Sequence, residues 1–64
     1  MITKSENREL TKLTQWRDAG YADAGLLARS LSALIRAART NRSAAYLRAV
    51  AAEWRVTDHP DFIA

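Results

Sequence analysis

The sequence contains no cysteine, and only one histidine, one proline and two glycines among its 64 residues. Without cysteine the chain can form neither a disulfide nor a thiolate metal site, and a single histidine cannot make a structural zinc site. We therefore expect no metal or other cofactor. Domains this small bury only about 60% of the surface that the unfolded chain exposes, and they usually need added stabilisation from a disulfide, a metal or a partner subunit. Self-association and docking on a partner are the sources of stabilisation that remain.

Long apolar runs are also missing. No uninterrupted run approaches the roughly 20 residues that a membrane-spanning helix needs. The first ten residues include Lys4, Glu6, Arg8 and Glu9, where a signal peptide would be apolar. We expect a cytoplasmic protein that does not bind membranes.

The motifs of the common enzyme classes are absent too. The chain has no glycine-rich phosphate loop, no nucleophile beside a base and no carboxylate pair with a plausible pocket. His59 lies in the sequence Asp58-His59-Pro60-Asp61, which is better explained as a polar turn after a helix than as a metal ligand or an acid–base group. The sequence therefore predicts a protein that binds and is not an enzyme.

Alanine is what the chain has in abundance. Its thirteen alanines favour helix, because alanine has the highest helix propensity, but they add little side-chain volume to a core. The eighteen larger apolar side chains fill one thin layer between helices. No stretch alternates apolar and polar residues as a half-buried strand would. We predict a single all-α domain over residues 1–64, a small three-helix domain made of a helical hairpin and an N-terminal helix.

The first helix is predicted over about residues 4–19. Thr3 and Glu6 have the spacing of a capping box, in which each side chain accepts a hydrogen bond from the other residue's backbone N–H. Gly20 suits the left-handed residue just past the helix end, and Tyr21 would then pack back onto the last turn. The apolar stripe of this helix consists of Leu10, Leu13 and Trp16.

The second helix is predicted over about residues 24–40, because Asp23 is a good N-cap. Its apolar stripe is wide enough to contact more than one neighbour, as the central helix of a bundle does. The alanines in it allow another backbone to approach closely, and we expect self-association, as a dimer, through alanine-rich helix faces. The stripe consists of Ala24, Ala28, Leu31, Ile35 and Ala38, flanked by Leu27 and Leu34.

The third helix is predicted over about residues 42–56, with either Asn41 or Ser43 as its N-cap. The polar turn around Pro60 then takes residues 57–64 out of the helix as a C-terminal tail. In this tail Phe62 and Ile63 either fold back as a lid or stay mobile until a partner binds. The short connections between the three helices favour antiparallel packing. The apolar face of the third helix consists of Leu47, Val50, Ala51 and Trp54, with Tyr46 at its edge.

Charge placement is the most informative feature. Residues 24–52 contain five arginines and no acidic residue. Clustered arginines bind nucleic-acid phosphates, but they also suit an acidic protein partner. A third interpretation is a solvated surface in which Arg36 and Arg39 meet the C-terminal end of a helix dipole. The candidate binding residues are Arg29, Arg36, Arg39, Arg42, Tyr46 and Arg48.

Two further patterns bear on binding. Tyr46 lies off the main apolar stripe and suits an interface, whereas Trp16 and Trp54 lie on apolar stripes and are expected in the core. The second and third helices have the spacing of a helix-turn-helix motif, with Arg42, Ser43 and Tyr46 at the start of the third helix as candidates to face a DNA groove. A generic helical hairpin has the same pattern.

In its small size, basic charge and lack of catalytic motifs, the chain resembles accessory proteins of temperate phages and other mobile elements. We expect a helical adaptor or regulatory protein that binds a protein partner. The alternative is a small nucleic-acid-binding protein that uses the arginines at the turn between the second and third helices. Phosphate binding should weaken steeply with salt, whereas a mainly apolar protein interface should persist.

Overall fold

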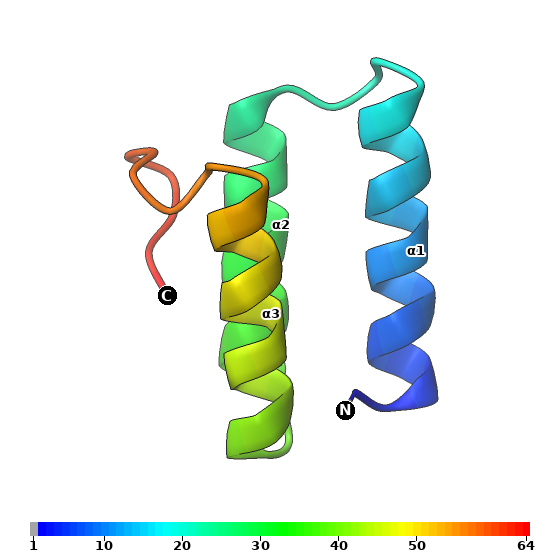
Figure 1. The fold of residues 1–64 in the computed structure, drawn as a ribbon, viewed down its shortest axis with the longest axis vertical. Coiled ribbons are helices and arrows are strands. Elements are labelled where there is room, and N and C mark those ends of the chain that lie inside the picture. Colours follow the sequence, from blue (N-terminus) through cyan, green and yellow to red (C-terminus); the bar gives the residue numbers. More distant parts are fainter. Residues whose placement is uncertain (1) are drawn as a thin grey trace.

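A computed structural model describes residues 2–64 as three α-helices and a C-terminal segment. Helix α1 spans Lys4–Asp18, α2 spans Ala24–Ala37 and α3 spans Asn41–Glu53. Successive helices run antiparallel, so the start of α1 lies at the same end as the turn between α2 and α3 (Figure 1). The described residues contain no strand, which confirms the predicted all-α class.

Helix α1 begins and ends as its sequence predicts. The backbone N–H of Thr3 donates to Glu6 Oε1 over 2.8 Å, and the N–H of Glu6 donates to Thr3 Oγ1 over 3.2 Å, which completes the capping box. At the other end Gly20 has φ of +80°, and the N–H of Tyr21 donates to the carbonyl of Trp16 as in a Schellman motif. The prediction for the Tyr21 side chain was wrong. It is 80% exposed, because Trp16 at the edge of the stripe offers it no buried surface.

The turn between α2 and α3 begins earlier than predicted. Asp23 caps α2 as expected, since its side chain accepts from the N–H of Leu26 over 2.8 Å. However, α2 ends at Ala37 and not near residue 40, because Thr40 must be extended to cap α3. Its hydroxyl accepts from the N–H of Ser43 over 3.0 Å. Thr40 is therefore the N-cap of α3, and the prediction of Asn41 or Ser43 was wrong.

Helix α3 ends at Glu53, three residues before the predicted end at residue 56. Its last turn closes with a second Schellman pair, in which the N–H of Arg55 donates to Ala52 and the N–H of Val56 donates to Ala51, both over 3.1 Å. Arg55 has φ of +60°, the only non-glycine residue with a positive φ in residues 2–64. Val56 is only 2% exposed, so this sharp turn carries it into the core.

The core lies along α2, which packs closely against α3 and more openly against α1. Leu31 and Leu47 are fully buried at its centre, and Ser32 and Ser43 are buried with them. Trp54 is half-buried, and the guanidinium of Arg17 lies 4.5 Å from the centre of its ring. The prediction that Trp16 belongs to the core was wrong, because its side chain is 39% exposed. The buried apolar residues are Leu10, Leu13, Leu27, Ala28, Leu31, Ile35, Leu47, Ala51 and Val56.

The C-terminal segment folds back onto α2. Ser32 holds it, since the hydroxyl donates to the carbonyl of Ala28 over 2.7 Å and accepts from the N–H of Ile63 over 3.0 Å. Arg29 Nη1 lies 2.9 Å from Asp61 Oδ2. Of the two tail residues predicted as a lid, Phe62 packs against the core and Ile63 is 63% exposed.

Candidate functional site

A groove runs along the boundary between α1 and α2. It consists of two adjoining hollows of about 300 and 240 Å³, which share Glu9 and Leu34. Trp16 closes the groove near the end of α1, and Arg39 closes it near the α2–α3 turn. Ala33 and Ala37 leave the α2 wall low, so that another backbone can approach it closely. The groove is also lined by Thr3, Ser5, Glu6, Lys12, Leu13 and Ser30.

The α1 wall of the groove carries charges of both signs. Lys12 Nζ lies 3.4 Å from Glu9 Oε1 and 5.4 Å from the centre of the Trp16 ring. Glu9 and Lys12 are both about half exposed, so water screens their attraction and it adds little stability. The wall therefore presents a carboxylate, an ammonium and an aromatic face that are all within reach of a partner.

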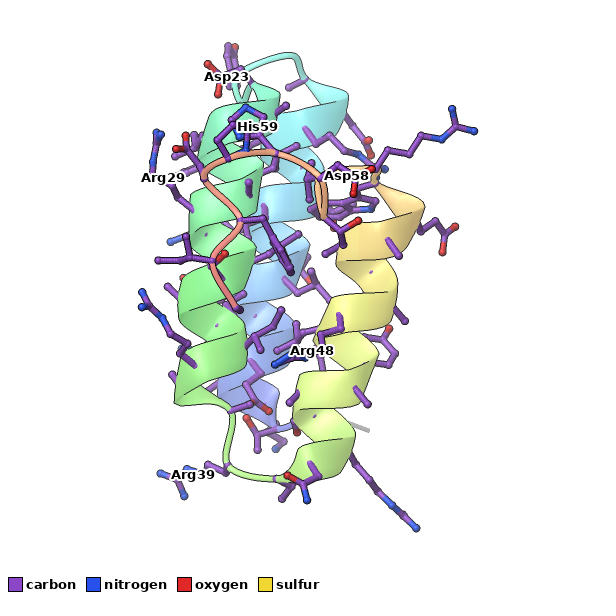
Figure 2. All side chains as sticks on the ribbon, turned by 90° about the vertical axis from the view of Figure 1, so that its left-hand side faces the viewer. Asp23, Arg29, Arg39, Arg48, Asp58 and His59 are labelled. Atoms are coloured by element: carbon purple, nitrogen blue, oxygen red, sulfur yellow. The ribbon has the colours of Figure 1, made fainter. Side chains whose placement is uncertain are left out.

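The end of the bundle at the α2–α3 turn is strongly basic. Lys4, Arg8, Arg36, Arg39 and Arg42 are exposed there, and none of them forms an ion pair within the part of the chain that the structure describes. We call these five residues the basic end. Figure 2 shows Arg39 at this turn, pointing away from the helices.

Glu6 is the acidic side chain buried beneath the basic end, with 8% of its surface exposed. The backbone N–H of Thr3 lowers the pKa of Glu6 most strongly, against the opposing effect of burial. The hydroxyls of Thr3 and Ser43 and the backbone N–H of Arg39 lower this pKa further. Glu6 therefore joins the start of α1 to the first turn of α3, where a negative charge also suits the helix dipole.

The opposite end of the bundle is acidic. It holds the end of α1, the start of α2, the end of α3 and the C-terminal turn (Figure 1). Asp23, Asp58 and His59 all lie at this end, with Asp58 on the α3 side (Figure 2). The charges are thus separated along the long axis. The charged residues of this acidic end are Arg17, Asp18, Asp23, Arg29, Glu53, Arg55, Asp58 and Asp61.

The structure brings together only part of the predicted binding set. Arg36, Arg39 and Arg42 meet at the basic end, and Tyr46, which is 47% exposed, lies one turn along α3 from Arg42. Arg29 lies apart, near the acidic end, where it pairs with Asp61. Arg48 is exposed on α3, between the turn and the C-terminal segment (Figure 2).

Sequence reasoning missed the groove. The face expected to associate carries Ala24, Ala28 and Ala38, and of these Ala28 is fully buried within the core. The alanines that line the groove are Ala33 and Ala37, which were not part of that predicted face. Polar Ser30 and exposed Trp16 lie on the faces of α2 and α1 that line the groove, and they are the signals that could have indicated it. Both signals depend on how α1 sits beside α2, which periodicity along one helix does not show.

Neither a membrane span nor a metal centre is found in residues 2–64. No helix there is long and apolar enough to cross a bilayer. No group of three or more histidine or acidic side chains in the same residues is placed to hold a metal ion. Comparison of the chain with protein-family models, curated proteins and solved structures finds no match in any of the three.

Proposed function

We propose that the protein is a small, non-enzymatic, cytoplasmic adaptor or regulatory protein that works by protein–protein contact. Its first contact, in this proposal, is with a second copy of the chain in the α1–α2 groove. The observation that carries the proposal is the groove itself, where exposed Trp16 and partly buried Leu34 lie beside the low wall of Ala33 and Ala37.

The low wall of small residues on α2 favours a helix as the occupant. The groove follows most of α1 and the second half of α2, from Ser30 to Ala37, as a site for a third helix would. Small residues on α2 permit a close helix crossing, and helices that cross are about 8–10 Å apart. Because the core is a thin layer without a disulfide, an additional buried surface would stabilise this chain more than it would a larger domain.

Charge complementarity favours a second copy as the source of that helix. Two copies related by a two-fold axis across the groove run antiparallel, so the basic end of one lies beside the acidic end of the other. Opposite charges then face each other along the interface, which favours this orientation over the parallel one.

A site-specific crosslinking experiment tests this proposal. A photoreactive phenylalanine analogue is placed at Ala33, inside the groove, and at Ala45, which is equally exposed on α3 but outside it. We expect irradiation to yield a covalent dimer from the Ala33 variant and not from the Ala45 variant. A crosslink from Ala33 to a different protein in host extract would keep the groove and reject the dimer. Crosslinking from neither position would overturn the proposal.

The dissociation constant of the dimer gives a second test. Ala33→Arg places two cations near the two-fold axis and should weaken the dimer at least tenfold, measured by analytical ultracentrifugation. Ala45→Arg adds the same charge on α3 and should leave the dissociation constant unchanged. Helicity by circular dichroism should be equal in both variants, because each alanine is exposed on its helix. A wild-type protein that stays monomeric at about 100 µM, a concentration far above the dissociation constant of a stable dimer, would contradict self-association.

A further inference from the structure

We propose that the basic end and Tyr46 form a surface that binds single-stranded nucleic acid. In this proposal Arg39 and Arg42 bind phosphates, and a base stacks on the ring of Tyr46. Tyr46 borders a hollow on the α3 side, outside the α1–α2 groove, whereas Arg39 also closes one end of that groove. The proposal needs a single copy of the chain, so it does not depend on the proposed dimer.

The arginines of the basic end are free to bind an anion. Arg36, Arg39 and Arg42 are exposed, and no acidic side chain in the described chain lies within ion-pair distance of them. The planar fork of arginine matches a phosphate with two parallel hydrogen bonds. Glu6, the nearest carboxylate in sequence to Lys4, is buried and already accepts the N–H of Thr3. It does not neutralise the surface by an ion pair.

Tyr46 supplies the feature that distinguishes this surface from a simple basic patch. Its ring is 47% exposed and borders a hollow of about 310 Å³ between α1 and α3. The hollow is lined by Ile2, Thr3, Lys4 and Asn7 in addition to Tyr46. A base stacked on the ring would thus have an ammonium and a side-chain amide within the same hollow. Because Arg42 precedes Tyr46 by four residues, the two share one face of α3.

This combination favours nucleic acid over an acidic protein. Interfaces with proteins gain most of their affinity from large buried anchors, and within residues 2–64 Tyr46 is the one large exposed hydrophobic side chain beside the basic end. Stacking on an aromatic ring beside basic side chains is the usual device of proteins that bind single strands without strong sequence preference. Bases in a duplex are stacked on each other and present no free face to Tyr46. We therefore expect weaker binding to duplex DNA than to a single strand.

Fluorescence anisotropy with a labelled oligodeoxythymidine of about 20 nucleotides tests the surface. The logarithm of the association constant should fall with the logarithm of the salt concentration, with a slope of about −0.7 for each phosphate bound. Arg42→Gln should reduce that slope by about this amount and weaken binding. Arg55→Gln removes the same charge from the acidic end and serves as the matched control, with unchanged binding.

Substitution of Tyr46 separates stacking from charge. Tyr46→Leu should weaken binding at least fivefold with an unchanged salt slope, whereas Tyr46→Phe should bind as the wild type does. Equal binding by the wild type and Tyr46→Leu would overturn the proposal, as would the absence of binding at about 50 mM salt. Polyglutamate is the competing acidic polymer, and equal or tighter binding to it would identify an acidic protein as the partner instead. The same measurements are made on the Ala33→Arg variant, in which the proposed dimer is weakened. Binding that is present in both proteins does not depend on the dimer.

Discussion

Replacement of Arg55 by glycine should stabilise the protein. Arg55 has φ of +60° at the end of α3, where its Cβ approaches the backbone carbonyl that follows. A left-handed conformation costs a residue with a side chain about 1–2 kcal/mol. No ion pair within the described chain involves the Arg55 side chain, so its removal loses little. Relief of the backbone strain is thus the main effect of the substitution.

The gain is partly offset in the unfolded chain. Glycine has more conformational freedom there than arginine, which costs about 0.4–1 kcal/mol on folding. The mid-range values, about 1.5 and about 0.7 kcal/mol, leave a net stabilisation of about 0.8 kcal/mol. For a domain of 60–100 residues this raises the midpoint of thermal unfolding by about 3–6 °C. The assay is thermal unfolding followed by circular dichroism at a fixed protein concentration, because dimer formation would make the midpoint depend on concentration.

Arg55→Ala provides the matched control. It removes the same charge and the same long side chain, but it keeps the Cβ that is strained at this φ. We expect no stabilisation from alanine. An equal rise in the unfolding midpoint for alanine and glycine would show that the side chain or its charge was responsible, and would refute the argument from backbone conformation. Unchanged stability in both variants would show that Arg55 does not hold a left-handed conformation in solution.

Two further substitutions test the buried charge and the core. Because the folded-state pKa of Glu6 is lowered, its carboxylate stabilises the fold above the ordinary pKa of 4.5, and this contribution is lost as pH falls through the lower, folded value. The unfolding midpoint of Glu6→Gln should therefore depend less on pH in the acid range below 4.5 than that of the wild type, measured by thermal unfolding at a series of pH values. Leu31 is fully buried, so Leu31→Ala should cost about 2–5 kcal/mol in urea unfolding, enough to unfold much of a marginal domain. A variant as stable as the wild type would mean that α2 buries another face.

Features that depend on a few neighbouring residues could be predicted from the sequence. The capping box of Thr3 and Glu6 and the left-handed Gly20 need only local spacing, and both are present. The α2 stripe was also readable, since Leu31 and Ile35 recur at helical spacing and are buried. These signals predict the all-α fold because they are local to one helix: a capping residue at its start, an apolar stripe along it, or a left-handed residue at its end.

The misplaced boundaries have a tertiary origin. Thr40, Asn41 and Ser43 are all acceptable N-caps, and only the packing of α3 on α2 selects Thr40. Arginine, unlike glycine, does not predict a left-handed turn. The end of α3 at Glu53 could therefore not be predicted from Arg55. Burial of Val56 stabilises the strained turn that precedes it.

The candidate site was predictable only in its charges. The arginines of residues 24–52 stand out by composition, but the partner of Arg29 is Asp61, which is 32 residues away in the chain. No periodic pattern links such a pair. The groove requires two helices side by side, and the exposure of Trp16 follows from the open packing of α1.

Gly25 shows a conflict between local preference and tertiary packing. A Cβ at this position would lie 3.1 Å from Asp61 Oδ2 and 3.5 Å from a ring carbon of His59, so glycine lets the C-terminal segment lie against α2 without a shift of the Asp61 carboxylate. Glycine is a poor residue for the first turn of a helix, and α2 therefore begins less favourably by itself than it would with alanine. The contact with the segment offsets that loss. Opening of the C-terminal segment and fraying of the first turn of α2 are consequently one coupled event, so this end of the small domain loses order as a unit.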